Sequence, residues 1–205
     1  MSTASTATTL ALKEWGAVVH ALLAGRQTVL LRKGGIHEKA FSVPDRAGGQ
    51  AASRDGAAAQ PGVVLFPTVA HSHRERVRDE HADLLELGEA DVSPDALLLR
   101  AGVQLVDVVE VARPAGLPAI ADLHIWTHES IQSERLDFRP KHALTVLVVR
   151  ALALPQPVRL PRTEQHRGCR SWLELDEVWD GVAGTAAVGN ARLAEDADRV
   201  RAEVG

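Results

Sequence analysis

The chain has 205 residues, of which 45% are apolar, and a formal net charge of −4. This composition supports one domain with a buried core. It excludes a protein that binds nucleic acid through its overall positive charge, but it still allows a local basic patch. The single cysteine, Cys169, excludes an intrachain disulfide and a cysteine-based zinc site. No secretory signal pattern and no run of about 18 apolar residues is present, so we expect a cytoplasmic protein without membrane contact.

The first 43 residues predict a helix followed by a hairpin. Residues 1–8 are Ser, Thr and Ala after the initial Met, and we expect them to be disordered. Apolar positions from Leu10 to Leu23 follow helical spacing and predict a helix that ends at Gly25. Residues 28–32 are β-branched and apolar, which predicts a buried strand, and residues 36–43 predict its return strand across a glycine turn.

The next segment combines a loop, a short strand and a charged helix. Residues 44–62 contain no large apolar residue and predict an exposed, flexible Ala/Gly loop. Residues 63–66 predict a short strand that a proline ends. Residues 71–88 carry both signs of charge at close spacing, which favours a solvated helix. Ser93-Pro94 is typical of a helix start, with Ser as the N-cap.

The second half alternates between strands and helices. Residues 103–111 predict a strand, and a helix is expected near residues 129–135. Residues 144–154 are almost continuously apolar and predict a central strand, which the following prolines would end. Residues 171–175 predict a last short strand, and residues 186–203 a terminal surface helix.

These elements indicate an α+β fold with a mostly antiparallel sheet or a small barrel and flanking helices, because hairpin-like connections outnumber crossovers. We expect a single domain over residues 9–180, followed by a C-terminal helical extension over residues 181–205. The sequence shows no internal repeat.

A short motif resembles the ASCH branch of the PUA-like superfamily. In that pattern a helix ends in Gly and is followed by Lys, Thr and a strand that ends in Arg; Gly25, Thr28 and Arg32 match, whereas Gln27 replaces the Lys and Leu30 the usual acidic residue. The resemblance implies a small PUA-like β-barrel associated with binding of RNA or modified nucleotides. The alternative is a capped helix against a hairpin whose basic residues are merely solvated.

A second resemblance covers most of the chain. The phrases LKEWGAVVHALLAGRQTVLLRKGGIHEKAF, VLFPT, HIWTHES and GCRSWLEL, spread over residues 12–175, resemble a bacterial family catalogued as domain of unknown function 1802. That resemblance implies no particular activity.

The histidines are the obvious candidate metal ligands. His71, His73 and His81 lie close together in sequence, and His124 and His128 have the i, i+4 spacing of a zinc pair on a helix. However, the pair lacks the HExxH pattern, and nine histidines in 205 residues make chance pairs common. We expect no metal site and no cofactor.

A metal-dependent phosphodiesterase is the enzymatic alternative. Such a site needs acids on neighbouring strands and a lysine that orients the attacking water. Asp107 and Glu110 lie on one predicted strand and Glu38-Lys39 on another. Adjacent strand residues point to opposite faces, so Glu38 and Lys39 would not share a site.

The arginines near residue 170 suit phosphate binding, because a guanidinium matches phosphate geometry. Cys169, between two of them, is either a nucleophile or a small buried residue. We hypothesise one pocket that binds RNA, DNA or a nucleotide by phosphate anchoring and stacking on Trp172 or Trp126. Its candidate ligand-binding residues are Thr28, Arg32, Lys33, His37, Glu38, Arg167, Arg170 and Trp172. A non-catalytic protein-interaction domain is the third hypothesis, and the sequence identifies no protein partner.

Overall fold

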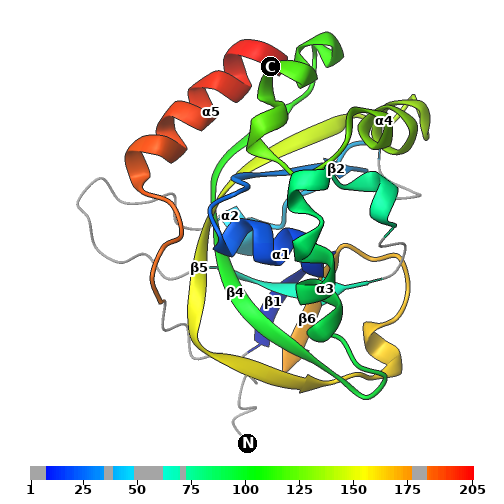
Figure 1. Ribbon diagram of the computed structural model, residues 1–205, viewed down its shortest axis with the longest axis vertical. Coiled ribbons are helices and arrows are strands. Elements are labelled where there is room, and N and C mark those ends of the chain that lie inside the picture. The colour runs from blue at the N-terminus through cyan, green and yellow to red at the C-terminus, as the bar shows by residue number, and fades with distance from the viewer. Residues whose placement is uncertain (1–7, 35–38, 49–61, 70–72, 177–183) are drawn as a thin grey trace, which may run out of the picture.

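The computed structural model describes residues 8–34, 39–48, 62–69, 73–176 and 184–205 (Figure 1). Within these residues the strands form one six-stranded sheet. The strands are β1 (Thr8–Trp15), β2 (Val29–Lys33), β3 (Val63–Thr68), β4 (Ala96–Glu110), β5 (Leu144–Pro161) and β6 (Trp172–Asp176).

Helical segments connect and cover these strands. The α-helices are α1 (Gly16–Leu23), α2 (Asp45–Gly48), α3 (Asp83–Ala90), α4 (His128–Ile131) and α5 (Asn190–Val204). The 3₁₀ segments are η1 (Arg74–Arg76), η2 (Asp79–His81), η3 (Pro114–Leu123) and η5 (Glu164–His166), and η4 (Gln132–Asp137) is a π-helical turn.

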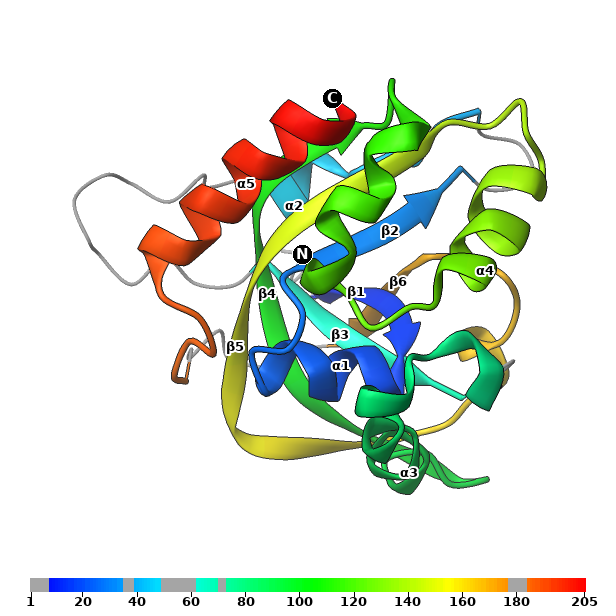
Figure 2. The ribbon, with the colours of Figure 1, turned by 45° about the horizontal axis from the view of Figure 1, so that its top comes forward.

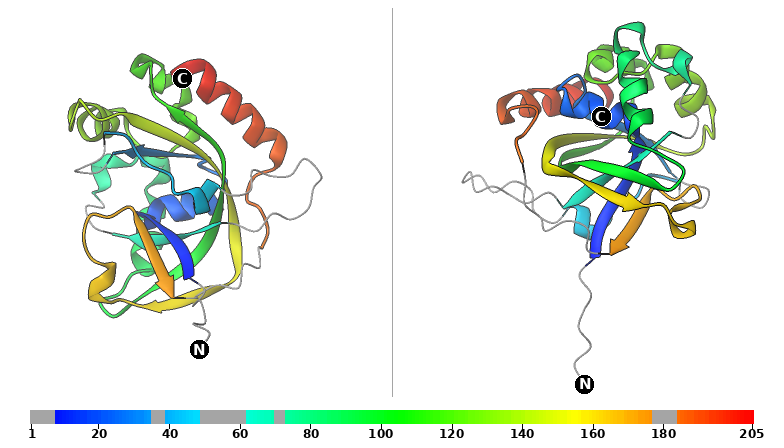
Figure 3. Two further views of the ribbon diagram at one scale, coloured as in Figure 1. Left: turned by 180° about the vertical axis from the view of Figure 1, so that it is seen from behind. Right: turned by 60° about the horizontal axis from the view of Figure 1, so that its bottom comes forward.

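The strand order is β2-β5-β4-β3-β1-β6. Among the described strands, β1 and β3 pair in parallel, and the other four neighbouring pairs are antiparallel. The sheet is open, because β2 and β6 are its two edges; Figure 3 shows β6 beside β1 at one of them. The prediction of an α+β fold with a mostly antiparallel sheet is therefore confirmed.

The long strands β4 and β5 pair over most of their lengths and bend around α1 (Figures 1 and 2). The main apolar core fills the space between the sheet and the helices. A smaller cluster, which includes Phe66 and Leu99, lies apart from it. Helix α5 lies on the outer side of the bent sheet, next to η3. It buries Leu193, Ala197 and Val200 there.

The predicted first helix is wrong over residues 10–15, which form β1. Leu10 and Leu12 are buried in the main core, whereas Ala11 between them is buried in the smaller cluster. A strand between β3 and β6 buries both of its faces, so its apolar residues need not alternate. The helix begins only at Gly16, and it is followed by Gly25 with φ of +67°, which confirms the predicted left-handed turn.

The predicted return strand at residues 36–43 is wrong where the structure describes it. Residues 39–43 contain no strand, and β2 pairs instead with β5, with Val29 opposite Val148. The helix predicted from Ser93 is also wrong. Ser93 accepts from the backbone N–H of Ala96 through its side-chain oxygen at 3.0 Å, which forms a tight turn into β4.

Prolines do not end the fifth strand as predicted. The register passes from Ala153 opposite Ala101 to Val158 opposite Leu99, so residues 154–157 bulge out of the ladder. Pro155 and Pro157 lie in this bulge, where no ladder hydrogen bond requires their missing N–H. The strand therefore continues to Pro161.

The charged helix predicted over residues 71–88 is interrupted. Residues 71 and 72 lie outside the described part. Val77 forms an isolated β-bridge with Trp126, and the N–H of Arg78 donates to the carbonyl of Ile125 at 3.0 Å. A helix cannot continue through residues whose backbone groups bond to another segment.

Other elements agree with their predictions, including strands near residues 103–111 and 171–175 and the terminal helix. The strand predicted at residues 63–66 is also present, but Pro67 does not end it, because β3 continues to Thr68. The helix near residues 129–135 is also confirmed as α4 and η4. Within the described residues, no helix has the length and apolar character needed to cross a bilayer.

Candidate ligand-binding site

Arg32, at the end of β2, is held by buried partners. Its Nη1 donates to Oε2 of Glu14 at 2.9 Å and to the carbonyl of Lys13 at 3.1 Å. Glu14 is only 7% exposed. The guanidinium also lies over the ring of Phe41, 5.1 Å from its centroid. Arg32 is therefore a partly buried cation with a fixed position, not a solvated surface group.

Lys33 points toward the turn that follows η4. Its Nζ donates to the carbonyl of Arg135 at 2.6 Å, and also to the carbonyls of Leu136 and Phe138. Burial, together with the charges of Arg135 and Arg139, lowers the pKa of Lys33. Lys33 therefore supplies positive charge to a site that already contains other cations.

Thr28 and Gln27, at the start of β2, make internal contacts. The hydroxyl of Thr28 donates to Oδ2 of Asp196 in α5 at 2.8 Å. Gln27 donates to the carbonyl of Val29 and accepts from the N–H of Ile125 at 3.2 Å. Both side chains are buried, so they hold neighbouring segments together.

The remaining candidates are distributed over two regions. Trp172 donates its indole N–H to the carbonyl of Ser42, and its ring centroid lies 5.8 Å from that of Phe41. Arg167 and Arg170 are exposed in the loop before β6. His37 and Glu38 lie outside the described residues.

The two faces of β1 separate these candidates. Glu14 contacts Arg32 on one face, and Arg32 and Trp172 both contact Phe41. Lys13, the preceding residue, points to the other face, where its Nζ donates to the carbonyl of Gly168. Charge from Arg170 lowers the pKa of Lys13, after the larger effect of burial. Arg32 and the arginines near residue 170 thus lie on opposite sides of β1.

A charged cluster surrounds Glu14 and Arg32. Arg76 pairs with Glu134, and Arg135 lies 3.8 Å from the same carboxylate. The guanidinium of Arg76 lies over Trp15, that of Arg135 lies over Trp126, and the two indole rings meet edge to face at 4.8 Å. Three arginines and two glutamates leave one positive charge over this cluster.

Arg135 is the most exposed arginine of the cluster by a small margin. Its side chain is 25% exposed, against 22% for Arg76 and 15% for Arg32. Within the described residues its guanidinium makes no hydrogen bond, and its ion pair with Glu134 is long. Burial is the main cause that lowers the pKa of Arg135. The protein thus holds a cation whose hydrogen-bonding capacity is unfilled.

A cavity of about 700 Å³, here called the chamber, lies beside this cluster. This is the size of a typical small-molecule site. Its walls come from η3, α4 and η4 and are mostly apolar. They include Pro114, Leu117, Pro118, Ile131, Leu136 and Pro140. Arg78, His124 and Trp126 add polar and aromatic groups.

A smaller cavity of about 270 Å³, here called the annex, adjoins the chamber. The two cavities share Pro114, Leu136 and Pro140 as lining residues. The annex is basic, because Lys33, Arg135, Lys141 and His142 also line it. An apolar compartment and a cationic one thus lie side by side.

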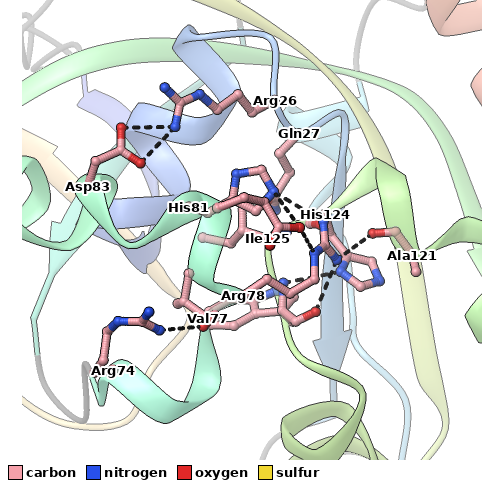
Figure 4. Close-up of polar contacts among 12 residues, drawn as sticks. Arg26, Gln27, Arg74, Val77, Arg78, His81, Asp83, Ala121, His124 and Ile125 are labelled. Atoms are coloured by element: carbon pink, nitrogen blue, oxygen red, sulfur yellow. Dashed lines mark hydrogen bonds and ion pairs between the residues drawn. The ribbon is translucent and has the colours of Figure 1, made fainter.

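Arg78 connects the segments on one side of the chamber and uses all its donors to do so (Figure 4). Its Nε donates to Glu80, and its Nη1 donates to the carbonyls of Ala121 and Trp126. Its Nη2 donates to the carbonyl of His124 at 2.6 Å and to Nε2 of His81 at 3.1 Å. Five N–H groups therefore have five acceptors.

His124, also in the chamber wall, is fully buried. Its Nδ1 accepts from the backbone N–H of Trp126 at 3.2 Å, which places the proton of the neutral ring on Nε2. Burial lowers the pKa of His124 to about 3, and the charge of Arg78 acts in the same direction. No partner for Nε2 is found within the described residues.

The described residues hold no group of three His, Cys, Asp or Glu side chains placed to bind a metal ion. His124 is buried whereas His128 is exposed at the start of α4, so the two do not form the pair that their spacing allows. Asp107 pairs with Arg201 of α5. Cys169 is exposed, which contradicts the interpretation of a small buried residue.

Sequence reasoning missed Glu14, Arg76 and Arg135. Glu14 lies in a segment that was predicted to be helical, and Arg76 lies in a charged segment that was predicted to be solvated. The sequence HIWTHES could have pointed to this region, because its residues His124, Trp126 and His128 line the chamber.

The chain thus folds as an open-sheet α+β domain with a basic, partly apolar site beside its second strand. The family model described as "Domain of unknown function (DUF1802)" matches residues 11–199, so the chain belongs to the DUF1802 family.

Solved structures with similar folds are ASCH proteins. The ASCH crystal structure from Zymomonas mobilis has a TM-score of 0.44 and 10% identity, with 96% of each chain covered. Two mutants of the Zymomonas mobilis ASCH protein have TM-scores of 0.43 and 0.42 at 11% identity; each match covers 82% of this chain, and 91% and 89% of those chains. No curated protein matches this chain.

Proposed function

We propose that this chain is a nucleotide or nucleic-acid binding module of PUA-like type, with its ligand in the chamber and the annex. The phosphate would lie in the annex, near Arg135, Lys33 and Lys141. The base would enter the adjoining chamber. The proposal concerns binding alone and includes no reaction.

The observation that carries this proposal is that the guanidinium of Arg135 makes no hydrogen bond within the described residues and lies among other cations. Burial disfavours the charge of Arg135. Burial is also the main cause that lowers the pKa of Lys33, and the charges of Arg135 and Arg139 act in the same direction. An anion placed between Arg135 and Lys33 would reduce the repulsion between their charges, and it would accept hydrogen bonds from the N–H groups of Arg135. A guanidinium fork suits phosphate in particular.

The chamber supports a base as the other half of the ligand. Its apolar walls and Trp126 offer contact to a flat ring, whereas the charged annex would bind that ring poorly. The resemblance of residues 25–32 to the ASCH motif agrees with a nucleotide ligand. In this proposal Arg32 is a supporting residue, because it holds Glu14 within the cluster.

Isothermal titration of the purified chain with GMP, IMP, AMP, UMP, CMP and a short single-stranded RNA tests the proposal. Arg135→Gln is the main variant and Lys141→Ala the second, since Lys141 is exposed and its side chain makes no hydrogen bond or ion pair within the described part of the chain. Arg159→Gln is the matched control, because Arg159 is exposed on β5 outside both cavities.

We expect saturable binding that Arg135→Gln weakens at least tenfold and Arg159→Gln leaves unchanged. Thermal unfolding of each variant checks that the fold is kept. Binding that is equal in wild type and in both annex variants, or no binding of any of these ligands, would contradict the proposal.

A further inference from the structure

The turn that follows η4 presents an aromatic ring to solvent. Phe138 is 56% exposed, which is more than any other large apolar residue in the described part of the chain, and it belongs to neither apolar cluster. Its backbone, in contrast, is fixed. Its N–H donates to the carbonyl of Ser133 at 3.1 Å, and its carbonyl accepts from Nζ of Lys33. The core does not use this ring, although the turn holds it in place.

Two cations with available donors accompany the ring. The guanidinium of Arg139 lies over it, 4.9 Å from the ring centroid. Arg139 has φ of +52°, and among the described residues only glycines share this left-handed backbone. Such strain persists where the surroundings enforce it, often at ligand sites. Within the described chain, the side chains of Arg139 and Lys141 make no hydrogen bond or ion pair.

The ring lies beside the annex. Burial is the main cause that lowers the pKa of Lys33, and the charges of Arg135 and Arg139 act in the same direction. The guanidinium of Arg139 is therefore close to Lys33, which lines the annex, and Phe138 lies against that guanidinium. Lys141 is exposed and also lines the annex. A ligand anchored in the annex can thus continue over this turn.

We infer that Phe138 stacks a second base, and that the ligand of this site is a single strand of at least two nucleotides. The inference rests on the function proposed above, and it adds the class of ligand and the residue that binds its second base. The phosphate between the two nucleotides would lie near Arg139 and Lys141.

The chemistry of the turn favours a single strand over a mononucleotide or a duplex. A mononucleotide that fills the chamber and the annex leaves Phe138 and Arg139 without ligand. Bases in a duplex already stack on one another, whereas those of a single strand are free to stack on an aromatic ring. Within residues 137–142 the two cations outnumber the one acid, Asp137, whose carboxylate accepts from Gln132 at 2.7 Å. This balance of charge suits a phosphate backbone.

The test is isothermal titration of the wild-type chain with AMP and UMP and with the 5′-phosphorylated dinucleotides pApA and pUpU, each in its RNA and DNA form. Phe138→Leu removes the aromatic face and keeps an apolar side chain, and Phe138→Trp keeps an aromatic face. Leu87→Ala is the matched control, because Leu87 is 47% exposed and lines neither cavity. Thermal unfolding shows whether each variant is folded.

We expect at least one dinucleotide to bind the wild-type chain about tenfold more tightly than its mononucleotide. Phe138→Leu should remove most of this gain and leave mononucleotide affinity unchanged, whereas Phe138→Trp and Leu87→Ala should retain it. The added phosphate is present in every variant, so the loss in Phe138→Leu isolates stacking from charge.

Two results would overturn the inference and leave the proposed function standing. One is a dinucleotide that binds the wild-type chain no more tightly than the mononucleotide. The other is a gain that Phe138→Leu leaves unchanged. Absence of binding by every mononucleotide and dinucleotide would instead overturn both.

A second readout observes the ring itself. The chain contains three phenylalanines, so labelling with 4-fluorophenylalanine gives three ¹⁹F NMR signals, and the spectrum of Phe138→Leu assigns that of Phe138. We expect this signal to shift with pApA much more than with AMP, because only the dinucleotide brings a base onto the ring. A Phe138 signal unmoved at saturating pApA would overturn the inference.

Discussion

At the scale of single residues, Glu14 balances the arginines of the charged cluster. It is 7% exposed and bonds to Arg32, which is 15% exposed. Replacing it by Gln leaves buried positive charge without a partner, and breaking a buried pair in this way is strongly destabilising. We expect Glu14→Gln to lower the free energy of unfolding in urea by about 3 kcal/mol.

The exposed pair of Arg26 and Asp83 serves as the control for this loss. Asp83→Asn removes a carboxylate that accepts from Arg26 at 2.8 Å on the surface. Because water screens such pairs, it should have a much smaller effect. Equal losses in the two variants would show that burial of Glu14 contributes nothing.

His124 makes the stability depend on pH. Its pKa is about 3 in the folded chain and ordinarily 6.5. Between these pH values His124 is protonated in the unfolded chain but neutral in the folded chain. The free energy of unfolding is therefore unaffected by this group above pH 6.5, and it falls by about 1.4 kcal/mol per pH unit as the pH decreases below 6.5. Urea unfolding at pH 4.5, 5.5 and 6.5 should show a slope that is flatter by about this amount in His124→Gln. Parallel curves for wild type and variant would contradict this assignment.

At the scale of elements, two glycines set the distance between α1 and α3. A Cβ on Gly16 would lie 2.6 Å from Cα of Gly88, and a Cβ on Gly88 would meet the backbone of residues 16 and 17 as closely. Backbone cannot move aside as a side chain can. We expect Gly88→Ala to cost about 3 kcal/mol in urea unfolding.

Gly189→Ala is the matched control, since a Cβ there meets nothing within 4 Å. It lies at the N-cap of α5, where Ala is less favourable than Gly, so we expect a loss of about 1 kcal/mol. A Gly88→Ala variant as stable as this control would show that the helices can separate without cost.

The same elements show what the sequence can and cannot predict. Strands such as β2 and β6 follow from local β-branched and apolar patterns. In contrast, β1 looks helical, because a strand buried on both faces loses its alternation. The interruption near Val77 depends on a bridge to Trp126, 49 positions later in the chain, and no local pattern encodes it.

The candidate site follows the same division. Lys33 and Trp126 were identified because basic and aromatic residues stand out in sequence, and both line the chamber or the annex. The pairing of Arg32 with Glu14, and the separation of both from Arg170 by β1, arise from strand order. Strand order is set by contacts between distant segments, so residue spacing alone does not predict which arginines converge.

At the scale of the whole molecule, α5 closes the core although the sequence predicts an extension after residue 180. Leu193, Val200 and Val204 are buried, and each contributes about 2 kcal/mol through burial of apolar surface. Asp196 accepts from Thr28, which ties the helix to the first residue before β2. Gly116 of η3 approaches the carbonyl of Glu203 so closely that a Cβ would not fit.

A chain ending at Gly189 should therefore lack a cooperative unfolding transition at 25 °C, because the lost burial of about 6 kcal/mol approaches the stability of a typical domain. Circular dichroism during urea titration measures this. Deletion of residues 1–7, predicted to be disordered, is the control and should leave the transition in place. Val200→Asp in the full-length chain tests the same packing without shortening it, because Val200 is 0% exposed and a carboxylate is costly to bury. If the shortened chain unfolded cooperatively at the wild-type midpoint, the domain would end before α5, and the helix would be the extension that the sequence predicts.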